Sequence, residues 1–121
     1  MQMNNVKFVK KPWGSETIWA HTDSYVGKIL HVYSGESLSV QYHNLKDETM
    51  YVLTGKGIIK FYIIQNDEMI LDGVHFVNPG DSVHIPPKQI HSVEAFEDMD
   101  IVEVSTNHLD DLVRLKDRYG R

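Results

Sequence analysis

Four polar side chains in this chain have the types and the spacing of a metal-binding set. They are Gln41, His43, Glu48 and His91. Because side chains alternate between the two faces of a β-strand, Gln41 and His43 point to the same side, and Glu48 begins the next run after a short turn. Two imidazoles, a carboxylate and an amide oxygen suit zinc, manganese, iron, cobalt or nickel, and positions remain open for water or substrate. The spacing does not choose among these metals.

Two members of the set have alternative roles. Glu48 is either a ligand or the group that accepts a proton from a substrate, and a neighbouring cation would stabilise its charge inside a barrel. An amide binds a metal less strongly than an imidazole, so Gln41 coordinates either directly or through a water molecule. The sequence therefore predicts a metal centre founded on the two histidines.

The elements that position these residues are short β-strands. Between positions 26 and 106, β-branched and aromatic runs are separated by glycine, proline and acidic turn signals, with no convincing helical period. Asp72-Gly73, between two apolar runs, predicts a two-residue hairpin turn. So many short strands must close into a barrel or a two-sheet jelly roll, because an open sheet would leave unpaired edges. The expected strands are residues 25–33, 38–43, 48–54, 57–64, 68–71, 74–77, 82–85, 91–95 and 100–104.

Only the C-terminal end has a helical pattern. Leu109, Leu112, Val113 and Leu115 follow a ragged helical period, with Asn107 as a cap in front of them. The predicted fold class is therefore all-β, with a short C-terminal helix or turn.

The composition is that of one domain, residues 1–121, without disulfides. A chain of this length buries a core as one unit, and the absence of cysteine excludes disulfides, thiolate metal sites and a cysteine nucleophile. The formal net charge is -5, with no basic run that would neutralise successive phosphates, so nucleic-acid binding is not expected. No segment has the roughly 20 apolar residues of a membrane span, and no signal peptide is evident. We expect no membrane association and a cytoplasmic location.

The metal-binding pattern resembles the first conserved motif of the cupin superfamily. That motif is a glycine, a ligand, a histidine, a glutamate and a second glycine at fixed intervals, and this chain fits every interval. The matching residues are Gly35, Gln41, His43, Glu48 and Gly55. The second cupin motif is matched by Gly80, Pro86 and His91, although Lys88 replaces the usual glycine and Ala95 the usual asparagine. The resemblance implies a double-stranded β-helix with one divalent metal ion, zinc first among those named above.

One branch of the superfamily, the type II mannose-6-phosphate isomerases, is similar over nearly the whole chain. This branch places glutamine where most cupins have histidine, as at Gln41. Lys11-Pro12-Trp13-Gly14 resembles its opening motif, and residues 117–121 match its closing Asp-Arg-Tyr-Gly-Arg. In contrast, Asn44-Leu45-Lys46 replaces the run of histidines and arginine that follows His43 in the branch, which indicates a different outer pocket.

The resemblance implies a sugar phosphate as ligand and a homodimer as assembly. Its implied activity is interconversion of mannose 6-phosphate and fructose 6-phosphate, with Glu48 as the catalytic base. Lys46, Lys88 and Arg118 are candidates for binding the substrate phosphate, because a charge-assisted hydrogen bond needs a fixed cation at the pocket rim. The alternatives are a metal cupin that binds a sugar or sugar phosphate without transforming it, and a metal-dependent oxygenase. The nucleotide-binding loop of longer members is missing from these residues, so no synthesis of a nucleotide sugar is expected.

Overall fold

The computed structural model describes residues 1–121 and contains strands and turns but no helix. It therefore has no helix that could cross a membrane. The strands are β1 (Lys7–Lys11), β2 (Gly14–His21), β3 (Val26–Val32), β4 (Val40–His43), β5 (Glu48–Thr54), β6 (Gly57–Gln65), β7 (Glu68–Val77), β8 (Ser82–Ile85), β9 (Ile90–Ala95), β10 (Met99–Ser105) and β11 (Leu112–Lys116).

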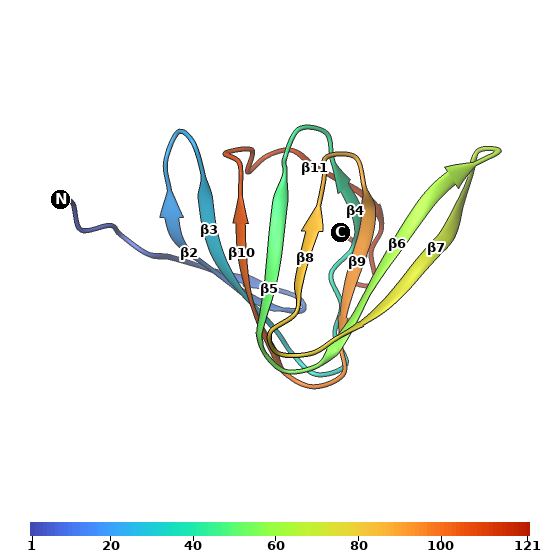
Figure 1. Cartoon of the computed structure of the whole chain (residues 1–121), viewed down its shortest axis with the longest axis horizontal. Coiled ribbons are helices and arrows are strands. Elements are labelled where there is room, and N and C mark those ends of the chain that lie inside the picture. Colours follow the sequence, from blue (N-terminus) through green and yellow to red (C-terminus); the bar gives the residue numbers. More distant parts are fainter.

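The strands form two antiparallel sheets, with the orders β1-β2-β3-β10-β5-β8 and β11-β4-β9-β6-β7. From β3 onward, every connection except the β6–β7 hairpin passes from one sheet to the other. Strands that follow one another in the chain are thus stacked across the interior, which is the arrangement of a double-stranded β-helix. Figure 1 shows the two sheets side by side, with the β6–β7 hairpin extending away from the rest. The predicted all-β fold class is confirmed.

The inward faces of the strands change from polar to apolar along their length. In β5 the alternating inward residues are Glu48, Met50 and Val52, and all three are buried. In β9, His91 precedes Val93 in the same way. Because the carboxylate and the imidazole lie at one level, the apolar side chains beyond them form a continuous core. The core consists of Trp13, Leu30, Val32, Leu38, Met50, Val52, Ile59, Val77, Ile85, Val93, Ala95, Met99 and Ile101.

Two N-terminal strands are additional to those expected from the sequence. β1 pairs only with β2 at the edge of its sheet, and most of its residues are exposed. Its alternating positions are Lys7, Val9 and Lys11, so the usual contrast between an apolar and a polar face is weak. Pairing with β2, rather than a hydrophobic pattern, makes this segment a strand.

The predicted turn at Asp72-Gly73 is wrong, because β7 is continuous through both residues. Asp72 is the extra residue of a bulge, opposite the step between Phe61 and Tyr62. The hairpin turns instead at Asn66-Asp67, where φ is 52° and 62°. Positive φ at both central residues is the requirement of a type I′ turn, and Asn and Asp tolerate it better than most residues.

The C-terminal segment, predicted as a short helix or turn, contains no helix and forms a strand. Leu112–Lys116 form β11, which pairs with β4 and places Leu112 opposite His43 and Arg114 opposite Gln41. Alternation of Leu112 and Arg114 with Val113 and Leu115 suits a strand, and the edge of β4 supplies hydrogen-bond partners that a separate helix would leave unpaired.

A substitution in the β6–β7 turn tests its position. Asp67→Gly should raise the free energy of unfolding by about 0.5–1 kcal/mol, because glycine adopts positive φ without steric cost. Asp72→Gly is the matched control and should lower stability, since it adds backbone freedom within a strand. Chemical denaturation of both variants gives the comparison, and stabilisation by Asp72→Gly alone would contradict the observed turn.

Candidate metal centre

Three of the four predicted ligands meet in the interior. His43 lies on β4, His91 on the neighbouring β9, and Glu48 on β5 of the opposite sheet. Their ligand atoms all lie within 4.8 Å of one another. Glu48 Oε1 is 3.2 Å from His91 Nε2 and 3.8 Å from His43 Nε2. Two ligands at about 2.1 Å from one ion are separated by roughly 3–3.5 Å, so these side chains are close to the geometry of a common ion.

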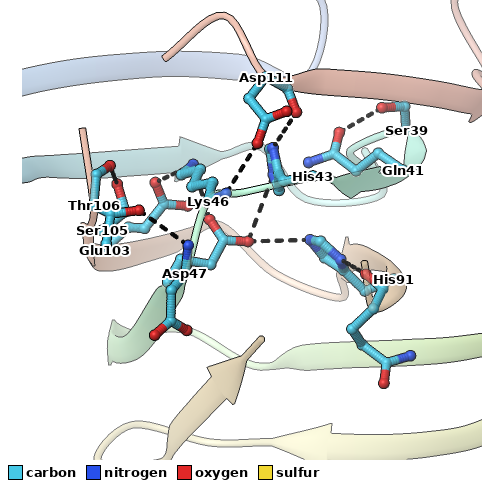
Figure 2. Close-up of polar contacts among 12 residues, drawn as sticks. Ser39, Gln41, His43, Lys46, Asp47, His91, Glu103, Ser105, Thr106 and Asp111 are labelled. Carbon is cyan, nitrogen blue, oxygen red and sulfur yellow. Dashed lines mark hydrogen bonds and ion pairs between the residues drawn. The ribbon is translucent and has the colours of Figure 1, made fainter. Parts of the chain in front are cut away.

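Backbone carbonyl groups orient both imidazole rings. His43 Nδ1 lies 3.2 Å from the carbonyl oxygen of Asp111, and His91 Nδ1 lies 2.8 Å from that of Gln89. A carbonyl oxygen only accepts a hydrogen bond, so each Nδ1 carries a proton, and in the neutral form of either ring the lone pair lies on Nε2. Burial, together with the charge of Lys46, lowers the pKa of His43 and favours the neutral ring. Figure 2 shows both rings directed toward the same interior point.

The centre contains polar atoms that the protein itself leaves unsatisfied. His43 Nε2, His91 Nε2 and Glu48 Oε1 are buried and have no hydrogen-bond partner, whereas Glu48 Oε2 contacts the ammonium group of Lys46. Buried polar atoms are rarely without a partner, because losing water without compensation costs on the order of a few kcal/mol for each group. Two lone pairs and an anionic carboxylate that converge in this way fit a divalent cation. These three residues could therefore hold a metal ion.

Lys46 occupies the side of Glu48 that faces away from the imidazoles. Its Nζ lies 2.9 Å from Glu48 Oε2 and 3.1 Å from Glu103 Oε2, and its side chain is buried. The sequence predicts Lys46 at the pocket rim as a phosphate ligand, but its ammonium group already pairs with two carboxylates. Glu103 is absent from the predicted set, although its alternation with Ile101 places it on the inward face of β10. An ionisable residue on an apolar strand face is the signal that would have identified it.

The two buried carboxylates, Glu48 and Glu103, have pKa values shifted in opposite directions. Burial raises the pKa of Glu48, but the contact with His91 and the charge of Lys46 outweigh this effect, and the resulting pKa is well below its usual range. Burial and the neighbouring charge of Glu48 raise the pKa of Glu103 to about 7. Glu48 is therefore the carboxylate that stays ionised beside the two imidazoles.

Asp111 fixes the loop between β4 and β5. Its carboxylate accepts hydrogen bonds from the backbone N–H groups of Asn44, Leu45 and Lys46, at 3.2, 2.6 and 2.9 Å. The hydrogen bond from Leu45 is the largest cause of a lowered pKa of Asp111. Because the carbonyl group of Asp111 also receives His43 Nδ1, one residue positions both an imidazole and the loop that carries Lys46 (Figure 2).

Gln41 lies beside the three ligands but is directed differently. It is the register partner of His91 on the adjacent strand. Its Oε1 accepts a hydrogen bond of 2.6 Å from Ser39 Oγ, so the oxygen points away from the centre as Figure 2 shows. A hydroxyl group both donates and accepts, so Ser39 would satisfy the amide in either orientation. Direct coordination by Gln41 therefore requires its amide to rotate.

A cavity of about 300 Å³ lies next to the centre and reaches Gln41, His43 and Lys46. It is enclosed by residues of β1, β2, β3, β4, β10 and β11 and of the segment before β11. The two other predicted phosphate ligands do not line it. Lys88 is exposed in the turn before β9, and Arg118 is exposed and donates a hydrogen bond to the carbonyl of Gly35. The outer pocket is thus formed by residues other than those expected.

Two sheets wound as a double-stranded β-helix around a buried histidine–glutamate centre define a cupin. The family described as "Mannose-6-phosphate isomerase C-terminal" matches residues 1–117, and the chain belongs to this family. The fold agrees with solved structures. Capsular polysaccharide assembling protein CapF from Staphylococcus aureus has a TM-score of 0.74 and 24% identity over 94% of this chain and 33% of CapF. An RmlC-like cupin from Shewanella frigidimarina has a TM-score of 0.69 and 11% identity, covering 88% of this chain and 87% of that chain.

Among curated proteins, mannose-1-phosphate guanylyltransferase of Escherichia coli strain K12 is 33% identical over 119 residues. The match covers 93% of this chain but only 23% of that relative. This chain therefore spans about a quarter of the length of the relative, and the activity of the longer protein does not transfer to it directly.

Measurements of metal affinity test whether the two imidazoles contribute more to metal binding than Gln41 does. His43→Ala and His91→Ala should each weaken zinc binding by more than about 100-fold, whereas Gln41→Ala should weaken it by about tenfold or less. The reason is that the two Nε2 atoms face the centre and the amide oxygen does not. Competition with a chromophoric chelator measures the affinities, and exposed His84 supplies the control variant His84→Ala. Equal losses for Gln41→Ala and His43→Ala would contradict the assignment.

The loop contact of Asp111 predicts a pH dependence of stability. Because its folded pKa is lowered, its contribution is present above the unfolded pKa of about 3.9 and is lost as the pH falls through the lower folded value. Asp111→Asn should therefore melt at a lower temperature than the original protein at pH 7, and the two curves should approach each other below about pH 4. Melting temperatures of both proteins, measured from pH 7 to below about pH 4, check this expectation. A difference in melting temperature that stayed constant over this range would contradict the role of the Asp111 carboxylate.

Proposed function

We propose that this chain is a metal-dependent sugar-phosphate isomerase that interconverts mannose 6-phosphate and fructose 6-phosphate. The observation that carries the proposal is the convergence of His43 Nε2, His91 Nε2 and Glu48 beside a cavity with many cationic residues. Membership of the isomerase C-terminal family supports it. The cavity volume of about 300 Å³ is at the small end of the range for ligand pockets, which suits a monosaccharide derivative.

Isomerisation of an aldose to a ketose requires movement of one proton between neighbouring carbons. A base removes the proton from C2, the electron pair forms the C1–C2 double bond, and the electrons of the C1 carbonyl move to O1. A proton is then returned to C1, while the hydroxyl proton of O2 passes to O1 and O2 becomes the carbonyl oxygen. A bound divalent ion would act as a Lewis acid toward the two oxygens. His43, His91 and Glu48 would hold it, and their carbonyl and lysine partners would keep them in place.

Two carboxylates, those of Glu48 and Glu103, are candidates for the base that transfers the proton. Glu48 is the base predicted from sequence, but its Oε1 faces the imidazoles and its Oε2 faces Lys46. A carboxylate stabilised in this way is a weak base, so the geometry favours Glu48 as a ligand. Glu103 lines the cavity and lies on the other side of the same ammonium group. We therefore assign metal binding to Glu48 and add Glu103 as a second candidate for proton transfer.

Turnover with mannose 6-phosphate tests the proposal. Protein loaded with zinc, manganese, cobalt, nickel or ferrous iron should form fructose 6-phosphate, detected by NMR or a coupled assay. Glu48→Gln should lose metal and activity together, whereas Glu103→Gln should retain metal and lose about 100-fold or more in kcat if it transfers the proton. Glu97→Gln changes an exposed carboxylate and serves as the control. Absence of product with every metal would reject the isomerase function.

A second candidate is a cupin that binds the sugar phosphate without transforming it. The observation that favours it is Lys46, which neutralises Glu48 from within and reduces its basicity. The chain also matches only a quarter of a guanylyltransferase relative, in which a binding role for this region would be sufficient. Thermal stabilisation by mannose 6-phosphate without product formation would support this candidate over the first.

A further inference from the structure

The cavity beside the metal centre concentrates positive charge in an otherwise acidic protein. The whole chain has 12 Lys and Arg against 17 Asp and Glu, with a formal net charge of -5. Six of the 12 basic residues line this cavity, against three of the 17 acidic residues. The basic residues are Lys7, Lys11, Lys28, Lys46, Arg114 and Arg121. Such a reversal of sign within one enclosed space favours an anionic ligand.

Three of these cations are already neutralised and three are free. Lys28 pairs with Glu16 at 3.5 Å, Lys46 pairs with two carboxylates, and Arg121 pairs with Asp117 at 2.9 Å. None of the ion pairs or side-chain hydrogen bonds of the chain involves the other three, which are Lys7, Lys11 and Arg114. These three side chains therefore have unused donors at the cavity wall.

Strand periodicity explains why the free cations share one wall. Lys7 and Lys11 occupy the same face of β1, with Val9 between them, and all three line the cavity. Arg114 comes from β11, where it is the register partner of Gln41. The two strands belong to different sheets and to opposite ends of the chain. Their cations reach one cavity because the fold brings both sheet edges to it.

The N-terminal and C-terminal sequence motifs both contribute residues to this cavity. Lys11 and Trp13 come from the opening Lys-Pro-Trp-Gly segment, and Arg121 is the last residue of the closing Asp-Arg-Tyr-Gly-Arg segment. Trp13 is buried in the core, and Asp117 and Tyr119 hold the Arg121 side chain. The motifs therefore place Lys11 beside a rigid tryptophan and leave it free of an internal counter-ion.

We propose that Lys7, Lys11 and Arg114 form a phosphomonoester anchor for a small polyhydroxy ligand whose other end faces the metal centre. This inference rests on the proposed function in that the cavity is taken to bind a sugar phosphate. Arg114 offers a planar pair of N–H donors to two phosphate oxygens, and the two lysines add compact positive charge. The cavity extends from these residues to His43, so one small ligand spans the anchor and the centre.

Binding to zinc-loaded protein tests the anchor independently of turnover. Calorimetry with mannose 6-phosphate should show affinity reduced by about 10- to 100-fold for Lys11→Gln and for Arg114→Gln, as expected for loss of one charged hydrogen bond. Zinc content and melting temperature should be unchanged. Lys10→Gln is the matched control, because Lys10 lies on the same strand and is exposed outside the cavity. Its affinity should stay within about twofold of the original.

The outcomes separate this inference from the isomerase proposal. Unphosphorylated mannose should bind all variants equally, and inorganic phosphate should show the same loss as mannose 6-phosphate. If Lys11→Gln and Arg114→Gln bind mannose 6-phosphate as well as Lys10→Gln does, the anchor is wrong even if the protein is an isomerase. If the two variants lose affinity while no product is ever formed, the anchor stands and the isomerase function fails.

Discussion

A buried anionic carboxylate between two imidazole lone pairs requires positive charge, and this requirement organises the interior. Glu48 is 2% exposed, and its two oxygens face opposite sides. The ammonium group of Lys46 neutralises one side at 2.9 Å, whereas the other oxygen meets His43 and His91 Nε2 atoms that have no proton to donate when the rings are neutral. An isolated charge in a protein interior is destabilising, so a second cation at the imidazole side would compensate for the burial of Glu48.

The double-stranded β-helix meets this requirement because it brings neighbouring strands of one sheet and a strand of the other to a single level. β4 and β9 supply the histidines, and β5 supplies the glutamate from across the interior. The apolar residues that follow on β5 and β9 form the core directly beyond the centre. Packing of the core therefore fixes the separation of the sheets, and with it the distance between the carboxylate and the imidazoles.

The local sequence pattern was sufficient to predict the positions of the two histidines and Glu48, but not the residues that line the cavity. Period-two alternation, a short turn and the motif intervals all act within a few residues, so they locate His43 and Glu48 without knowledge of the sheet order. The buried position of the Lys46 side chain depends on its contact with Glu103, which is 57 positions away in the sequence. The positions of the cationic residues of β1 and β11 depend on how these edge strands pair with β2 and β4. The missed turn has the same cause, since Asp72-Gly73 is an acceptable turn sequence that the register with β6 converts into a bulge.

Charge also connects the centre to the cavity. When both are ionised, Glu48 and Glu103 together exceed the single charge of Lys46, so without an ion the centre adds negative charge beside the cationic wall of the cavity. A divalent cation would reverse that balance, and the free cations of the wall would then act in the same direction as the centre. Coupling between two binding sites is reciprocal, so in the proposed function metal binding and anion binding would strengthen each other. Lys46 would reduce this coupling, because it already supplies part of the positive charge that the carboxylates need.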